Sequence, residues 1–319
     1  TNNALWAWGT NSIGVLGVNN TVLYSSPLQV GALTNWKLVS GGSNFTMAIK
    51  TDGTLWTWGA NYNGQLGRGF AGGTTATGGY YSSPVQVGAL TNWKSVAPGQ
   101  LHWAAIKTDG TLWTCGYNVD GELGLGTNGA GYYSSPIQVG ALNNWKSLAT
   151  TGSVNYHNMA IKTDGSLWGW GYNSRGQIGN GNTTSYSSPI QVGTLTNWKQ
   201  IAVGARHTLA VKTDGTLWAW GGTDSGQLGT GVVSTTVYYS SPIQVGSLTN
   251  WKSVSAGAFF SAAIKTDGTL WTWGANRNGE LGVGNTTYYS SPVQVGALTN
   301  WRTVNMSYHM LAVTFAELS

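Results

Sequence analysis

The chain has 319 residues, of which only 8% are charged, and it contains 48 glycines, 18 tryptophans and one cysteine. This length is enough to bury a large core, a single cysteine excludes an internal disulfide, and no run of about 18 apolar residues predicts a membrane-spanning helix. The net charge of +5 raises the question of a nucleic-acid partner, which depends on where the charges fall.

The predicted elements repeat along the chain. A strand "LWAWG" at 5–9 comes first, and "KTDGTLWTWG" at 50–59 returns in nearly the same letters at 107–116, 162–171, 212–221 and 265–274. A second anchor, "NW", also occurs six times, at Trp36, Trp93, Trp145, Trp198, Trp251 and Trp301. A period of about 50–57 residues that covers the whole chain predicts six structural repeats.

Each repeat is predicted to hold four short strands. In order they are "SPVQV", "WKSVSAG", "HTLAVK" and "LWAWG", and the turns between them contain "GALTN", a glycine-led loop and "TDGT". Asp-Gly between two alternating runs is a strong hairpin signal, and nothing predicts a helix. The sequence thus predicts an all-β protein, a six-bladed β-propeller of four-stranded blades over residues 1–319 as one domain.

The two ends of the chain predict how the propeller closes. The chain begins with a fourth strand at 5–9, and residues 290–315 read as three strands without a fourth. We therefore expect a closing blade that is shared between the N- and C-termini.

The run "VGARHTLAVKTDGTLWAWGGTDSGQLGTG" at 203–231 resembles the repeat of the regulator of chromosome condensation family, and the likeness extends over essentially the whole chain. The resemblance implies a propeller fold. It also implies either guanine-nucleotide exchange on a small GTPase, as in the eukaryotic founder, or inhibition of an enzyme by capping, as in a bacterial relative. The monotony of the repeats is similar to bacterial or viral members, and no insertion resembles the founder's wedge.

Comparison of the repeats separates two sets of loops. We call the "TDGT" and "GALTN" turns the constant rim; their sequences barely change. The glycine-led turn before "HTLAVK", the "NxxGQLG" loop and the link before "SSP" form the variable rim, and all length differences between repeats fall there. The variable rim also carries all 15 tyrosines, four arginines and four acidic residues, whereas the ten lysines flank constant-rim turns.

Aromatic and arginine side chains on short polar loops are typical of a protein-binding surface. The alternative interpretation is unconstrained loop variation, with the "YY" pairs packed between blades. The predicted partner-binding residues are Trp103, Tyr62, Phe259, Arg206, Arg277, Tyr156, Tyr308, Tyr117, Tyr172, Arg175, Asp120 and Asp224.

No catalytic, metal or cofactor site is predicted. Four histidines share one position of the repeat, but phenylalanine replaces them in two other repeats, which favours a structural hydrogen bond over a metal ring: His102, His157, His207, His309, Phe45 and Phe260. Cys115 replaces a framework tryptophan and is expected to be a small buried residue. The glycine-rich loops lack the lysine and the helix of a phosphate-binding loop.

These observations predict a non-enzymatic recognition module that binds a protein partner through the variable rim. Glycan binding and a structural role in a cell-surface or virion fibre are the alternatives, and we expect an extracellular or surface location. The variable rim is neutral and the positive surplus lies on the constant rim, so we expect neither nucleic-acid binding nor membrane insertion.

Overall fold

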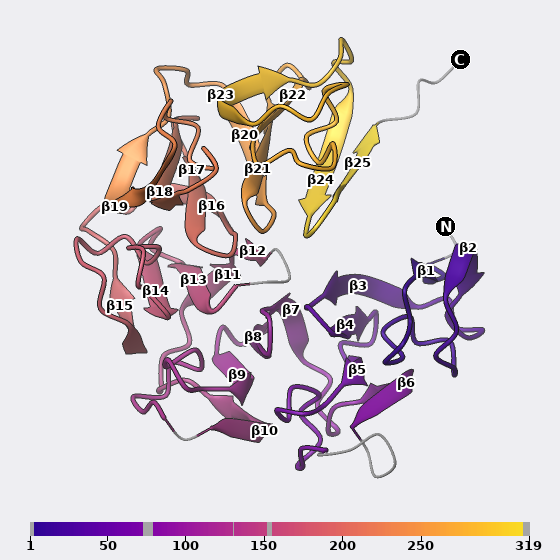
Figure 1. The fold of residues 1–319 in the computed structure, drawn as a ribbon. Helices are drawn as coiled ribbons and strands as arrows, with labels where there is room; N and C mark the ends of the chain where they lie inside the picture. The colour runs from indigo at the N-terminus through magenta and orange to yellow at the C-terminus, as the bar shows by residue number, and fades with distance from the viewer. Residues whose placement is uncertain (1–2, 73–78, 130, 152–154, 315–319) are drawn as a thin grey trace. The chain divides into compact units, whose positions relative to one another are not determined.

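The computed structural model describes residues 3–72, 79–129, 131–151 and 155–314, which form strands, turns and loops as predicted (Figure 1). The chain divides into two compact units, Thr1–Leu148 and Ala149–Ser319, and the single domain predicted for 1–319 stays a prediction. In the described part of the chain no helix is long and apolar enough to cross a membrane.

The first unit contains a two-stranded sheet, two four-stranded sheets and a further strand. The first sheet pairs β1 (Trp6–Gly9) with β2 (Tyr24–Gln29). The four-stranded sheets are β3 (Trp36–Gly41), β4 (Phe45–Lys50), β5 (Leu55–Ala60) and β6 (Tyr80–Gln86), then β7 (Trp93–Pro98), β8 (His102–Lys107), β9 (Leu112–Tyr117) and β10 (Tyr132–Gln138). The strand β11 (Trp145–Leu148) ends the unit.

The second unit continues the same pattern. It contains β12 (Thr150–Thr151), β13 (His157–Lys162), β14 (Leu167–Gly171), β15 (Tyr186–Gln191), β16 (Trp198–Val203), β17 (His207–Lys212), β18 (Leu217–Thr223) and β19 (Ser234–Gln244). It then contains β20 (Trp251–Ala256), β21 (Phe260–Lys265), β22 (Leu270–Gly274), β23 (Tyr289–Gln294), β24 (Trp301–Met306) and β25 (Met310–Thr314). Neighbouring strands are antiparallel except for β12, which lies parallel to β16.

The sheets begin one strand later than the sequence predicted. The "SSP" strand does not open a sheet; it closes the sheet of the preceding "LWxWG" strand, with Trp218 opposite Gln244 and Gly221 opposite Tyr239. The hydrogen bonds between these two strands continue beyond the paired residues, since the Val245 N–H donates to the Leu217 carbonyl. The "SSP" strand is therefore held by the preceding "LWxWG" strand. The "GALTN" segment is therefore the link from one sheet to the next.

This shift corrects the expected division of strands at the chain ends. The N-terminal sheet has two strands, β1 and β2, and the C-terminal sheet has two strands, β24 and β25, rather than one and three. These two sheets belong to different units, and their union in one closing blade stays a prediction.

The core lies between consecutive sheets and is built on tryptophan. In the second unit Trp198 contacts Trp218 and Trp220 edge to face, with ring centroids 6.1 and 6.0 Å apart. Every residue of β17 is buried, since its two faces pack against different neighbours. A fully buried strand of this kind tolerates no polar substitution without a partner, so the variable side chains stand on the loops at the strand ends.

Candidate functional site

The variable-rim loops rest on a fixed hydrogen-bonded frame. The Asn61 side chain accepts a bond from the Leu66 N–H at 3.1 Å and donates to the Phe70 carbonyl at 2.9 Å. The Gln65 side chain accepts from the Asn63 N–H at 2.8 Å. The asparagine bond recurs in the pairs Asn11–Leu16, Asn118–Leu123, Asn173–Ile178 and Asn276–Leu281, and the glutamine or glutamate bond in Asp120–Glu122, Arg175–Gln177, Ser225–Gln227 and Asn278–Glu280.

Four of these loops are also anchored to the following sheet by an indole N–H that donates to the carbonyl of Val15, Gln65, Gln177 or Gln227. In the second unit the Gln177 carbonyl accepts bonds from Trp220 Nε1 at 2.8 Å and Thr208 Oγ1 at 2.7 Å. Gly179 has a φ of +87°, and a Cβ there would lie 2.6 Å from Trp220 Nε1, so only glycine fits. The loop backbone is thereby fixed by both hydrogen bonds and contact, and the side chains between these fixed points are free to differ.

Those free side chains occupy a small number of equivalent positions. One precedes the histidine position of each repeat and holds Asn44, Leu101, Tyr156, Arg206, Phe259 and Tyr308. The others follow the fixed asparagine or threonine and hold, among others, Tyr62, Val119, Asp120, Arg175, Asp224 and Arg277. The sequence reasoning overlooked Val119, which is 40% exposed; aligning the repeats at the fixed asparagine identifies it.

Three predicted residues form a continuous exposed cluster in the second unit. Arg206, Phe259 and Tyr308 lie on consecutive turns, which are joined by bonds from the Ala205 N–H to the Ala258 carbonyl and from the Ala258 N–H to the Ser307 carbonyl, both 3.1 Å. The Arg206 guanidinium lies 6.0 Å from the Phe259 ring centre. Phe259 is 36% exposed and Tyr308 62% exposed.

Arg206 also makes an ion pair with Asp224, in which Nη1 and Oδ2 are 3.3 Å apart. The arginine side chain is 45% exposed and the aspartate 15%. An exposed pair of this kind contributes about 0–1 kcal/mol. The guanidinium can therefore exchange this carboxylate for another at little cost.

The remaining predicted residues of the second unit differ in exposure. Tyr156 and Tyr172 are half-buried against each other, with ring centres 6.4 Å apart, and the Tyr172 N–H donates to the Tyr156 carbonyl at 3.0 Å. Arg175, also half-buried, donates from Nη1 to the Thr235 carbonyl at 2.9 Å. Arg277 is exposed.

In the first unit the predicted residues lie on two loops, of which the one after β9 is acidic. Tyr62 is 41% exposed, and Tyr117 and Asp120 are half-buried. Glu122 is buried at the position that holds glutamine in other repeats, and burial raises the pKa of its carboxyl to about 7. Burial, and to a smaller extent the carboxylates of Glu122 and Asp120, raise the pKa of Tyr117.

Trp103 is a correction to the predicted site. It is fully buried, its Nε1 donates to the Gln65 carbonyl at 2.8 Å, and its ring contacts Trp93 at 6.2 Å. In other repeats this place belongs to the second tryptophan of "LWxWG", which Cys115 replaces here, and Trp103 and Cys115 face each other on paired strands. The indole has moved to the neighbouring strand but fills the same volume, so Trp103 is a framework residue.

The histidines and the cysteine have structural roles. His157 Nε2 lies 2.9 Å from Thr208 Oγ1 and His207 Nε2 3.0 Å from Ser261 Oγ, which confirms the expected hydrogen bonds for these two. Burial lowers the pKa of His207 to about 3. Cys115 is buried as expected, and burial raises the pKa of its thiol. Over the described ranges no group of three or more His, Cys, Asp or Glu side chains could hold a metal.

The constant-rim lysines are of two kinds, which differ in burial. Lys37, Lys94, Lys146, Lys199 and Lys252 are exposed. The lysines that precede "TDG" are buried against indole rings, with Lys212 Nζ 3.5 Å from the Trp218 ring centre and Lys107 Nζ 3.5 Å from that of Trp113. These lysines are part of the framework.

The comparisons with known proteins match the repeats directly. Six segments match the family model described as the regulator of chromosome condensation (RCC1) repeat, at residues 2–49, 52–106, 109–161, 164–211, 214–264 and 267–310. A second model of the same description matches 36–65, 198–227 and 251–280. Each full match starts in an "LWxWG" region and ends in a "HTLAVK" region, so one repeat supplies the last two strands of one sheet and the first two of the next.

Similar curated proteins come from plants and mammals. The ultraviolet-B receptor UVR8 of Arabidopsis thaliana is 33% identical over 194 residues, which are 58% of this chain and 41% of the receptor. The mitochondrial RCC1 domain-containing protein RUG3 of the same plant is 30% identical over 283 residues, which are 88% of this chain and 51% of RUG3. The chain thus spans about half the length of these relatives, and the expected affinity to bacterial or viral members stays a prediction.

Solved structures share the fold. Human WBSCR16 superposes with a TM-score of 0.82 at 23% identity, over 97% of this chain and 80% of that one. Yeast RCC1 (Prp20) bound to Kap60 superposes with a TM-score of 0.81 at 21% identity, over 97% and 76%. The predicted all-β propeller with six repeats is confirmed, and this fold is typically a non-catalytic module that mediates protein binding, guanine-nucleotide exchange aside. The chain belongs to the regulator of chromosome condensation (RCC1) repeat family.

Proposed function

We propose that this chain is a non-enzymatic recognition module that binds a protein partner through its variable rim, with Arg206, Phe259 and Tyr308 at the centre of the contact. The observation that carries the proposal is the arrangement of these three side chains. They are exposed and adjacent, and they stand on turns joined by backbone hydrogen bonds. The solved yeast Prp20 structures, one with Kap60 and one studied for binding to Gsp1p and histones, give a precedent for protein binding by this fold.

The physical chemistry of the cluster favours a protein interface. The rings of tyrosine and phenylalanine bury a large area with few rotatable bonds. Tyrosine and arginine are enriched among the residues that dominate the binding energy of interfaces. The fixed loop backbone reduces the conformational entropy lost on binding. Arg206 is available for a partner carboxylate because its present ion pair with Asp224 is solvent-exposed.

The test places a photo-reactive benzoylphenylalanine at position 308 and, as a matched control, at Leu33, an exposed residue of the constant rim. Cross-linking in extracts of the source cells should capture a protein at 308 and not at 33. The Arg206→Ser/Phe259→Ser double variant should lose that product while keeping the melting temperature. Equal capture at both positions, or capture that survives the double variant, would contradict the proposal.

A glycan array distinguishes protein binding from the main alternative, which is glycan binding. Binding to a defined sugar that the same double variant abolishes, without any protein captured at 308, would favour glycan recognition by this surface. The extracellular or surface location, including a place in a cell-surface or virion fibre, stays a prediction for localisation experiments on the full natural protein.

A further inference from the structure

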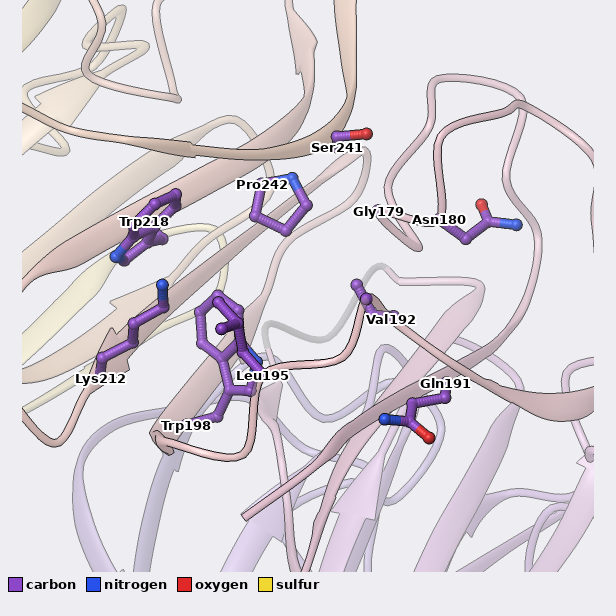
Figure 2. Close-up of a pocket in the computed structure, with 11 residues that line it drawn as sticks. Gly179, Asn180, Gln191, Val192, Leu195, Trp198, Lys212, Trp218, Ser241 and Pro242 are labelled. Atoms are coloured by element: carbon purple, nitrogen blue, oxygen red, sulfur yellow. The ribbon is translucent and has the colours of Figure 1, made fainter.

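A pocket of about 300 Å³ lies in the second unit, between β15 with its following link and the sheet β16–β19. Its apolar walls are Val192, Leu195, Trp198, Trp218 and Pro242, and its mouth carries Asn180, Gln191 and Ser241. Figure 2 shows the aromatic rings and Lys212 on one side of the pocket and Val192 on the other. None of these residues belongs to the variable-rim cluster.

Lys212 supplies the only formal charge among the residues that line this pocket. The residue is only 4% exposed, and its Nζ lies 3.5 Å from the Trp218 ring centre and 4.8 Å from that of Trp198. Within the described part of the chain no hydrogen bond or ion pair reaches this ammonium. Its three donors are therefore left to ring faces, to solvent and to what enters the pocket.

The nearby aspartate does not satisfy this lysine. Asp214 Oδ1 accepts bonds from the Thr216 N–H at 2.9 Å and hydroxyl at 2.6 Å. Burial lowers the pKa of Lys212, and the charge of Asp214 raises it to a smaller extent. An ammonium without a hydrogen-bonded partner in the protein can form charge-assisted hydrogen bonds with an anion at this place, and such an anion would stabilise it.

A pocket with the same apolar walls occurs in the first unit. A space of about 430 Å³ is lined by the equivalent Val87, Leu90, Trp93, Trp113 and Pro136. The charged residue that lines this pocket is Arg68. Lys107, which stacks on the same two indoles at 4.9 and 3.5 Å, is not among the lining residues. The apolar walls and the two indoles thus recur in both units, whereas the charged lining residue is Lys212 in one pocket and Arg68 in the other.

We propose that these inter-sheet pockets bind a carboxylate carried on a compact apolar group. The carboxylate would lie at Lys212 Nζ, and the apolar group would pack against Val192, Leu195 and Pro242. Charge-assisted hydrogen bonds supply orientation, and burial of the apolar group supplies most of the free energy. Such a ligand is either a free organic acid or the C-terminal residue of a peptide.

The experiment titrates the 15N-labelled full chain with three probes and follows the indole N–H signals of Trp218 and Trp113 by NMR. The probes are 4-methylpentanoate, its neutral amide, and acetate. We expect saturable shifts with 4-methylpentanoate at a dissociation constant on the order of 1 mM, and binding at least tenfold weaker for the amide and for acetate. Equal binding of the acid and its amide would overturn the proposal.

Variants assign the response to the pocket. Lys212→Met keeps the hydrocarbon chain and removes the charge, so the Trp218 response should vanish while the Trp113 response, an internal control, remains. Leu195→Ala changes an exposed residue and tests the apolar wall even if Lys212→Met does not fold. Leu23→Ala, at an exposed leucine outside both pockets, should bind like the wild type. A Trp218 response that is unchanged in both Lys212→Met and Leu195→Ala would overturn the proposal.

A fourth probe separates the two sources of the carboxylate. N-acetyl-glycyl-leucine binding more tightly than 4-methylpentanoate would support the proposal with a peptide C-terminus as the ligand. The reverse order would support it with a free acid. No response to either carboxylate would overturn it.

Discussion

The constant and variable rims of the same sheets stabilise their loops in opposite ways. On the constant rim the side chains themselves carry the structure: Asp214 holds Thr216, the Thr216 hydroxyl accepts a bond from Trp218 Nε1 at 2.8 Å, and Lys212 covers the Trp218 ring. On the variable rim the backbone and two fixed side chains per loop carry the structure. The side chains that form these contacts are therefore the same in nearly every repeat. The side chains that differ between repeats lie mostly at loop positions that the fold does not need.

The largest expected effect on stability is at Trp103, which the sequence predicted on the variable rim and which the structure places in the core. Trp103→Thr should lower the free energy of unfolding by about 3–5 kcal/mol, because it empties a large buried volume. The double variant Trp103→Thr/Cys115→Trp restores the arrangement of the other repeats and should recover most of the loss. Chemical denaturation of both variants measures this. If the Trp103→Thr variant were as stable as the wild type, Trp103 would not be a framework residue.

Next in size is a charge reversal on the constant rim. Lys212→Glu places a carboxylate against ring faces and near Asp214, and we expect a loss of about 2–4 kcal/mol, in the range for an unpaired buried charge. Lys199→Glu, an exposed reversal on the same rim, should stay within about 0.5 kcal/mol. Similar melting temperatures for the two variants would show that the buried lysines are not structural.

A pH effect is expected at Glu122, a frame residue of the variable rim. Its folded pKa of about 7 lies above the ordinary value of 4.5, so between about pH 4.5 and 7 the native state binds more protons than the unfolded state. The free energy of unfolding therefore falls as pH rises through this window. Glu122→Gln should remove that slope and stabilise the protein at pH 8 by about 1–3 kcal/mol. Chemical unfolding of the wild type and of Glu122→Gln at pH 5 and 8 measures this difference. The same pH dependence of the free energy of unfolding in both proteins would show that Glu122 is not its cause.

The smallest effect on stability is expected at the exposed cluster. Arg206→Ser and Phe259→Ser should each change the free energy of unfolding by less than about 1 kcal/mol, since neither side chain fills a core position. Thermal denaturation measures this, with Phe260→Ser, the buried neighbour of Phe259, as the destabilising control. A large loss at Phe259 would place it in the framework and remove it from the proposed contact.

The repeat, the strand identities and the division into rims could be read from the sequence because period, alternation and turn residues are local signals. The grouping of strands into sheets could not, because a link and a hairpin turn of similar length differ only in the hydrogen bonds they close. Trp103 was misplaced for a related reason. Alignment of repeats compares positions within a strand, whereas the indole moved across to the paired strand, where Cys115 left room. The buried lysines were missed because the sequence does not distinguish a lysine that is stacked on tryptophan rings from one that is exposed to solvent.

The division of each RCC1 repeat between two sheets has an evolutionary consequence. A duplicated or deleted internal repeat joins half-sheets that already match, because each of the four repeats between residues 52 and 264 begins with the third strand of one sheet and ends with the second strand of the next. Recombination between such repeats can therefore change their number without leaving an unpaired strand at the junction. Copy number is then open to drift, while the chemistry displayed on the variable rim changes one residue at a time.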